Sequence, residues 1–224
     1  MSQIYLIRHG QASLGKANYD QLSAVGLQQA SKLGGHLARI DKTPSLIISG
    51  SMKRHQQTAD TVLESFNPGH SPEQIIDPRW NEFDFEILIR QYLAEIAYDQ
   101  PKPTKTSEFF SALKNALYAW SDGQLTGKMP ETWSQFEERI RNALTDLLSH
   151  KHERIFVFSS GGAISMAIKH VMRLDPRAMI DLNLQTRNTG VSELISSKDR
   201  CYVSSLNHVA HLLTPETIDL ITYA

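Results

Sequence analysis

Arg8 and His9 follow a short apolar run, residues 4–7, and directly precede Gly10. The run is rich in β-forming residues, so we expect a short buried strand that ends in a cation and an imidazole. Such groups are costly to bury unless an anion or a hydrogen-bond partner meets them. Gly10 permits a sharp turn and lets backbone N–H groups approach a bound group. These residues predict a phosphate site; the alternative is a surface turn with an incidental histidine.

Two further apolar runs end in similar turns. Residues 46–48 are followed by Ser-Gly-Ser at 49–51, and residues 154–158 are followed by Ser-Ser-Gly-Gly at 159–162. In sheets covered by helices, ligands gather at the carboxyl ends of the strands. The coincidence of three polar, glycine-containing turns therefore favours the phosphate site over the surface turn.

The helix expected after the second turn begins near Met52 and carries Lys53 and Arg54 in its first turn. Cations at this end of a helix oppose the helix dipole. An anion bound at the helix N-terminus would remove the conflict, so Arg54 becomes a candidate phosphate ligand.

The elements that must position these residues alternate between strands and amphipathic helices, which predicts an α/β fold. We expect a three-layer sandwich, with helices on both faces of a mostly parallel sheet. No linker or repeat divides the chain, so we expect a single domain, 1–224, with a helical cap insertion at about 85–129. The expected strands are 4–7, 46–48, 75–76, 154–158, 191–195 and 202–206, and the expected helices are 24–40, 52–66, 87–98, 107–120, 133–148, a helix ending at 172, and 178–182.

Composition narrows the class of protein. The net charge of −1 argues against a nucleic-acid partner, because proteins that bind nucleic acids usually carry a basic surface. The single cysteine, Cys201, suits a reducing compartment. No signal peptide and no bilayer-length apolar run are visible, so we expect a cytoplasmic protein with no membrane partner. His208 and His211 have a zinc-like spacing but no nearby cysteine cluster, so we expect no metal.

Several segments together carry a resemblance to a known family. The chain is similar, over its full length and in the family order, to the histidine phosphatase superfamily with its phosphoglycerate mutase-like fold. It also resembles a bacterial branch with Arg-His-Gly-Gln-Ala-Ser and Arg-Asn-Thr motifs. Arg-His-Gly alone is a weak signal, but Arg-x-x-Gln-Thr-Ala from Arg54 at this distance makes it specific. The matching segments are 6–13, 22–30, 51–59, 81–83, 160–162 and 188–191.

The resemblance implies a two-step phosphoryl transfer. The imidazole of His9 attacks phosphorus to give phosphohistidine, and water or a second acceptor then removes the phosphoryl group. Arg8 and Arg54 match the two phosphate-binding arginines, whose planar guanidinium groups suit phosphate oxygens. Glu82 matches the acid that protonates the leaving oxygen and later activates water, with Asp84 as its nearest rival.

Other positions carry weaker implications. Ser13 matches a position near the phosphate, and Arg187 lies before a strand that the resemblance places near the site. The superfamily normally has a second histidine directly before Gly-Gly, where this chain has Ser160 followed by Gly161. A serine brings no positive charge, and loss of one donor aimed at the transition state typically costs ~2.7–4 kcal/mol.

Three consequences of Ser160 stay open. Activity can persist at a lower level, with the amides of Gly161 and Gly162 at a helix N-terminus supplying part of the electrostatic field. His55, which follows Arg54, can replace the missing imidazole, or it can point outward, since neighbours on a helix differ by about 100°. The site can also bind phosphate without chemistry.

The expected function is cofactor-independent hydrolysis of a small phosphomonoester through phospho-His9. A phosphoglycerate mutase is the second enzymatic interpretation, and a phosphate- or phosphopeptide-binding module is the non-enzymatic one. A homodimer through a sheet edge or the cap is left open. A mutase needs a strongly basic pocket. The basic residues of the expected cap region are scattered: Arg90, Lys102, Lys105, Lys114 and Lys128.

Overall fold

A six-stranded mixed sheet forms the centre of the molecule, in the order β3-β2-β4-β1-β5-β6. The computed structural model describes residues 1–13, 19–99, 103–198 and 200–223. The first four strands of that order run parallel, while β5 is antiparallel to both β1 and β6. The strands are β1 (Ser2–Arg8), β2 (Leu46–Ser49), β3 (Glu73–Ile76), β4 (Arg154–Ser159), β5 (Val191–Ser197) and β6 (Arg200–His208).

Helices cover both faces of the sheet, which confirms the predicted α/β class. Alternate residues of β1 enter different cores: Tyr5 and Ile7 pack beneath α1 and α2, whereas Ile4 and Leu6 join the core on the other face. The first face carries α1 (Ala24–Arg39) and α2 (Lys53–Leu63), and the second carries α5 (Trp133–Ser149), α6 (Gly161–Met172) and α7 (Pro176–Leu184).

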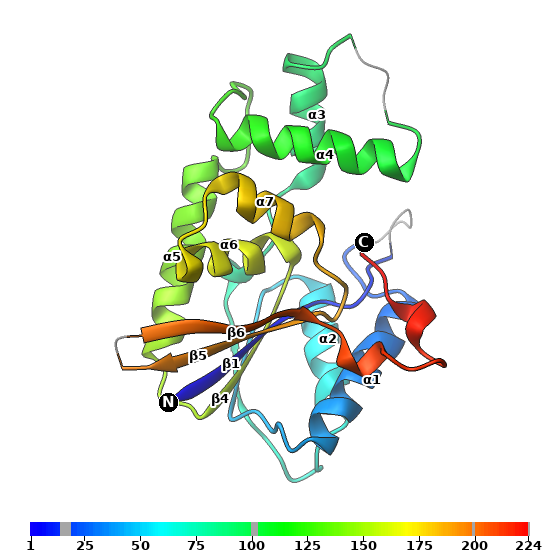
Figure 1. Cartoon of the computed structure of the whole chain (residues 1–224), viewed down its shortest axis with the longest axis vertical. Helices are drawn as coiled ribbons and strands as arrows, with labels where there is room; N and C mark the ends of the chain where they lie inside the picture. The colour runs from blue at the N-terminus through cyan, green and yellow to red at the C-terminus, as the bar shows by residue number, and fades with distance from the viewer. Residues whose placement is uncertain (14–18, 100–102, 199, 224) are drawn as a thin grey trace.

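Two helices lie beyond α7, away from the sheet (Figure 1). They are α3 (Phe85–Glu95) and α4 (Thr106–Ser121), which pack on each other, and α4 also packs on α7. They fall within the segment expected as a cap. Short 3-10 turns at Pro78–Trp80, Ala210–Leu212 and Ile218–Leu220 complete the described elements.

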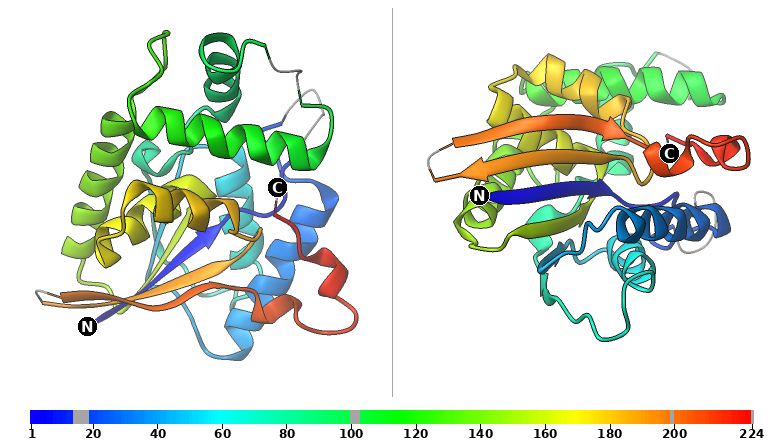
Figure 2. Two further views of the ribbon diagram at one scale, coloured as in Figure 1. Left: turned by 45° about the horizontal axis from the view of Figure 1, so that its top comes forward. Right: turned by 60° about the horizontal axis from the view of Figure 1, so that its bottom comes forward.

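The strand register aligns the three polar turns. Arg8 of β1 lies opposite Ser159 of β4, and Ser49 of β2 lies opposite Phe158. The backbone continues this alignment beyond the strands, because His9 N–H donates to Ser159 O and Gly50 N–H donates to Phe158 O. In Figure 2, β1 runs towards the end of the molecule that α4 crosses, and β4 and β2 run parallel to it.

Several predicted helices have different bounds in the structure; the helix expected over 87–98, for example, is α3 (Phe85–Glu95), and two others have a local explanation. The helix expected to reach residue 66 ends at Leu63, and Phe66 enters the core from the turn that follows. The helix expected over 178–182 is longer, because Pro176 occupies its first turn and the Asp175 side chain accepts a hydrogen bond from Ala178 N–H.

None of the helices in the described ranges is both long and apolar enough to cross a lipid bilayer. Within the same ranges, no three His, Cys, Asp or Glu side chains gather as they would around a metal ion.

Candidate active site

His9 lies just beyond the end of β1 and is buried. Its Nδ1 is 2.7 Å from Gly10 O. A carbonyl oxygen can only accept, so the ring proton sits on Nδ1 and Nε2 keeps its lone pair. Burial lowers the pKa of His9 well below 6.5, and the charges of Arg54 and Arg8 lower it further. His9 is therefore a neutral imidazole with a nucleophilic nitrogen.

Arg54 enters the site from the first turn of α2. Its Nε–H donates to His9 Nε2 over 3.2 Å, and its Nη1 forms an ion pair with Asp20 Oδ1 at 2.8 Å. The Tyr19 ring lies against the guanidinium, 5.3 Å from ring centroid to Cζ. These contacts fix the planar guanidinium beside the nitrogen of His9 that would meet a phosphorus atom.

Asp20 also resolves the conflict between the α2 dipole and its cations. Its Oδ2 accepts a hydrogen bond from Lys53 N–H at 2.9 Å. The expected anion at this helix end is thus, in part, the protein's own carboxylate. Sequence reasoning missed Asp20, because no spacing rule links it to a helix that begins 33 residues later.

Arg8 is the last residue of β1. Its Nη1 donates to Thr186 O at 2.5 Å and to Tyr223 O at 2.7 Å. Its Nε is buried and has no hydrogen-bond partner among the described residues, which leaves a donor available to an anion. Burial lowers the pKa of Arg8 to about 10, so the side chain stays protonated at neutral pH.

Glu82 faces the arginines from the loop that follows the 3-10 turn. Its Oε2 accepts from Gly162 N–H at 2.9 Å, and its Oε1 accepts from Phe83 N–H at 3.2 Å. A Cβ on Gly162 would lie only 2.3 Å from Oε1, so this position requires glycine. Burial raises the pKa of Glu82, although these hydrogen bonds and Arg54 oppose the shift. Glu82 can therefore be both a proton donor and a proton acceptor.

Asp84, the alternative candidate for the catalytic acid, caps a helix instead. It is exposed, and its Oδ1 accepts from Ile87 N–H at 2.9 Å, which makes it the N-cap of α3.

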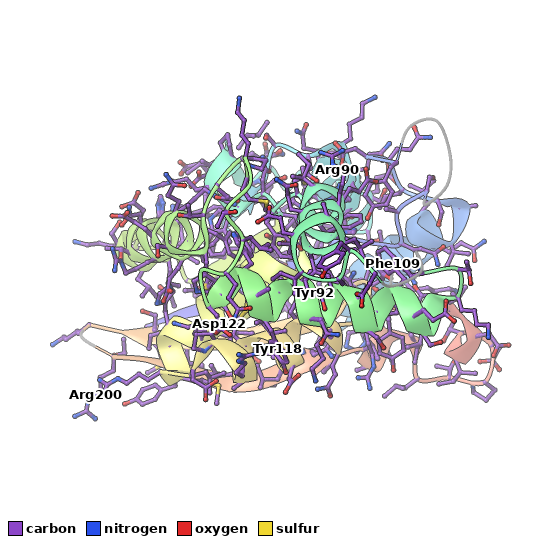
Figure 3. The ribbon with its side chains drawn as sticks, turned by 90° about the horizontal axis from the view of Figure 1, so that it is seen from above. Arg90, Tyr92, Phe109, Tyr118, Asp122 and Arg200 are labelled. Carbon is purple, nitrogen blue, oxygen red and sulfur yellow. The ribbon has the colours of Figure 1, made fainter. Side chains whose placement is uncertain are left out.

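One pocket unites these groups. The floor of the pocket holds the charged and imidazole side chains, and α3 and α4 supply apolar side chains opposite them. Figure 3 shows Phe109 on the side of α4 that faces α3. The lining residues are Arg8, His9, Tyr19, Arg54, Glu82, Phe83, Phe85, Phe109, Phe110, Leu113, Asn183, Leu184 and Tyr223.

The sequence matches a known family over nearly its whole length: residues 4–209 match the histidine phosphatase superfamily (branch 1). The chain belongs to this superfamily.

Individual relatives are distant. A protein of Hydrogenobacter thermophilus named "Putative phosphoserine phosphatase 2" is 19% identical over 219 residues, which cover 94% of this chain and 98% of that protein. The alpha-ribazole phosphatase of Shigella flexneri is 22% identical with a TM-score of 0.67, over 93% of this chain and 97% of that chain. A phosphoserine phosphatase mutant from Entamoeba histolytica, in complex with phosphoserine, is 19% identical with a TM-score of 0.63, over 95% and 100%. At this level of identity the structural likeness establishes the fold.

This member of the histidine phosphatase superfamily pairs Ser160 with His55. Ser160 precedes α6, and its Oγ lies 2.7 Å from His55 Nε2. His55 is fully buried, and its ring centroid is 5.5 Å from that of His9. The imidazole therefore points into the site, not outward. Gly50 makes room for it, since a Cβ there would lie 2.2 Å from His55 Nδ1.

The tautomer of His55 follows from its partners. Burial and Arg54 lower the pKa of His55 well below 6.5, so the ring is neutral and carries one proton. Nδ1 has no hydrogen-bond partner among the described residues. An unpaired lone pair is less costly to bury than an unpaired N–H donor, so the proton belongs on Nε2. His55 thus donates to Ser160 Oγ and leaves the hydroxyl proton free to donate elsewhere.

Three other predicted site residues border the pocket or lie outside it. Gly161 lies beside Arg8, because a Cβ there would be 3.6 Å from Arg8 Nε. The Ser13 hydroxyl donates to Leu22 O at 3.2 Å, and Ser13 is not among the lining residues. Arg187 does not line the pocket either; its guanidinium lies against the ring of Tyr223, 5.9 Å from Cζ to the centroid.

Asn188, in the matched segment 188–191, makes a contact with His9 that the sequence did not predict. Its Nδ2 donates to His9 O at 3.2 Å and helps fix the backbone of His9.

Proposed function

We propose that this chain is a phosphatase that hydrolyses a phosphomonoester through a phosphohistidine on His9. The observation that carries the proposal is the convergence of Arg8, His9, Arg54 and Glu82 on one pocket. Membership of the histidine phosphatase superfamily supports it, and so do the names of relatives that are phosphatases.

The first step forms the phosphoenzyme. The lone pair of His9 Nε2, released from its hydrogen bond with Arg54 Nε–H, attacks phosphorus, and the bond from phosphorus to the leaving oxygen breaks. The carboxylic acid of Glu82, whose pKa is raised by burial, gives its proton to the leaving oxygen. Arg8 and Arg54 stabilise the charge on the other phosphoryl oxygens.

The second step releases phosphate. The Glu82 carboxylate takes a proton from water, and the water oxygen attacks phosphorus as the bond to His9 Nε2 breaks. Inorganic phosphate leaves, and Glu82 is again protonated.

The Ser160–His55 pair supplies the donor that the superfamily's second histidine normally provides. His55 Nε2–H donates to Ser160 Oγ, which leaves the hydroxyl proton available to a phosphoryl oxygen. The pair brings no formal charge, but a preorganised neutral donor still acts where charge develops. In this view, the chain belongs to a bacterial branch of the superfamily in which a serine, here Ser160, replaces that histidine.

His9→Ala is the direct test of the proposal. We expect turnover of an aryl phosphate to fall to the uncatalysed background, because no other group supplies the nucleophile. Alkaline quenching of wild-type protein during turnover of a substrate with a labelled phosphoryl group should trap label on His9. Lys53→Gln, an exposed neighbour on α2, is the matched control and should keep full activity. Unchanged turnover of His9→Ala would remove His9 from the mechanism.

Four variants test the Ser160–His55 pair. We expect Ser160→Ala to lower kcat by about 100-fold and His55→Leu by about 10-fold, with KM little changed. His55→Gln keeps an N–H near the position of Nε2 and should stay within about threefold of wild type. Adding His55→Leu to Ser160→Ala should have no further effect. If His55→Leu lowers kcat by the same factor in both backgrounds, the pair does not act as a unit.

A binding module is the second candidate, and the absence of a charged residue at position 160 favours it. It predicts binding of inorganic phosphate by calorimetry together with no turnover of any phosphomonoester. Ser160→His distinguishes a damaged site from one organised around serine. We expect this substitution to lower activity, because His55 already occupies the space beside Ser160.

The mutase interpretation gains no support from the pocket. Arg90, Lys105 and Lys128 are exposed, and Lys114 pairs with Asp181 at 2.7 Å. None of these four residues lines the pocket. Lys102 lies outside the described residues.

A further inference from the structure

The charged groups of the pocket are few and already engaged. Among its described lining residues, only Arg8, Arg54 and Glu82 carry a formally charged side chain. Arg54 shares its charge with Asp20, and both arginines are needed for the phosphoryl group. No cation among these lining residues is left to neutralise a second anionic group on a substrate.

The cations of α3 and α4 do not supply that charge. Figure 3 shows Arg90 on the side of α3 away from α4 and from Phe109. Lys114 forms its ion pair with Asp181 of α7, and its Nζ lies 5.4 Å from the centroid of the Tyr118 ring. These cations serve the outer surface of the two helices and not the pocket.

Aromatic side chains form a continuous wall over the phosphate site. Phe85 lies edge-on to Tyr19 at 5.8 Å between ring centroids, and edge-on to Phe109 at 6.3 Å. Phe110 continues the wall, 6.0 Å from Phe109. All four side chains are only partly buried. Their open faces present apolar surface that a ligand can remove from water, which is a source of affinity.

Glu82 adds a second constraint on the leaving group. Glu82 lines the same pocket as the arginines and the aromatic residues of this wall. Once Glu82 has lost its proton, it repels a negative charge on the departing alcohol. A leaving group with its own carboxylate or phosphate would therefore be repelled by Glu82, and no cation among the described lining residues is free to pair with it.

We propose that the pocket takes phosphomonoesters of uncharged, apolar or aromatic alcohols and discriminates against those that carry a second anionic group. The inference rests on the proposed phosphatase function and names its substrate class. It also separates this chain from relatives whose names specify phosphoserine, which carries a carboxylate.

A matched pair of aryl phosphates tests the charge rule. Para-carbamoylphenyl phosphate and para-carboxyphenyl phosphate have similar shapes and differ in one negative charge. We expect kcat/KM for the neutral amide to exceed that for the carboxylate by at least about tenfold. In a series of n-alkyl phosphates, kcat/KM should rise about threefold to fourfold per added methylene along the aromatic wall. An equal or higher kcat/KM for the carboxylate overturns the proposal.

Variants of the wall test where the preference resides. Phe109→Ala should lower kcat/KM for naphthyl phosphate about tenfold more than it lowers kcat/KM for methyl phosphate. Phe109→Arg should raise kcat/KM for para-carboxyphenyl phosphate relative to the amide, because it places a cation in the wall. Tyr98→Ala is the control, since this aromatic residue is 79% exposed and does not line the pocket. If Phe109→Ala lowers both substrates equally, the wall does not select the alcohol.

A binding measurement separates failure of this inference from failure of the phosphatase proposal. Calorimetry with His9→Ala gives the affinities for the amide and the carboxylate without turnover. Tighter binding of the amide supports the inference even if wild-type protein turns over neither compound. Equal affinities, or tighter binding of the carboxylate, contradict it even if wild-type activity depends on His9.

Discussion

Two regions of the pocket are built on opposite principles. The floor consists of polar groups held in place by strand ends and hydrogen bonds. It is defined as Arg8, His9 and Arg54, which line the pocket, together with the His55–Ser160 pair that lies beside His9. The roof, defined as Phe85, Phe109, Phe110 and Leu113, consists of half-buried apolar side chains from two packed helices. The contrast indicates a division of labour, in which the floor sets the reaction and the roof sets the alcohol.

That division has a measurable consequence. A change in the floor alters the stabilisation of a phosphoryl group common to all substrates, so it should lower every rate by a similar factor. A change in the roof alters contacts with the alcohol, so it should change the ratio between substrates.

Among the variants that test this comparison, Arg54→Lys should give the largest effect. Lysine keeps the positive charge but loses the planar guanidinium that reaches both His9 Nε2 and Asp20. We expect kcat to fall by about 100- to 1,000-fold for methyl phosphate and naphthyl phosphate alike. Steady-state kinetics on both substrates measures the two factors. A loss confined to one substrate would break the distinction between floor and roof.

The floor was largely predictable from sequence because glycine-containing turns and buried strands are local signals. Arg8, His9 and Arg54 each stand beside such a signal, and the parallel register of β1, β2 and β4 brings them together. The inward direction of His55 was not predictable, since it depends on the space left by Gly50 on another element.

The roof was predictable as a helical segment but not as a surface. The helices at 87–98 and 107–120 were expected nearly where α3 and α4 lie. Which of their residues face the pocket depends on how α4 packs on α3 and α7, and that packing leaves no local mark. Asp20 was missed for a similar reason, because its contacts with Lys53 and Arg54 are set by tertiary structure.

His55→Gln should change how the free energy of unfolding depends on pH, because His55 is buried in the floor. His55 is buried and its pKa lies well below 6.5 in the folded protein, whereas the unfolded chain titrates near 6.5. Below pH 6.5 the unfolded state therefore binds a proton that the folded state does not, and stability falls as the pH decreases. One such group contributes a slope of up to ~1.4 kcal/mol per pH unit.

Urea unfolding at pH 8 and pH 5 measures this linkage. At pH 8 the histidine is neutral in both states, so His55→Gln should be no more stable than wild type. At pH 5 the variant should lose less stability than wild type, because the titrating group is gone. Parallel losses in the two proteins between these pH values would mean that His55 is hydrated or charged in the folded state.

Tyr223→Ala should give the smallest effect, and it sharpens the comparison because Tyr223 touches both regions. Its carbonyl oxygen accepts from Arg8 in the floor, whereas its ring lines the pocket and lies against Arg187. The substitution keeps the carbonyl and removes the ring, so Arg8 should stay in place. We expect kcat/KM for naphthyl phosphate to fall about threefold through lost apolar contact, with methyl phosphate unchanged. A loss of tenfold or more on methyl phosphate would show that the ring holds Arg8 in position, in which case floor and roof are one unit at this residue.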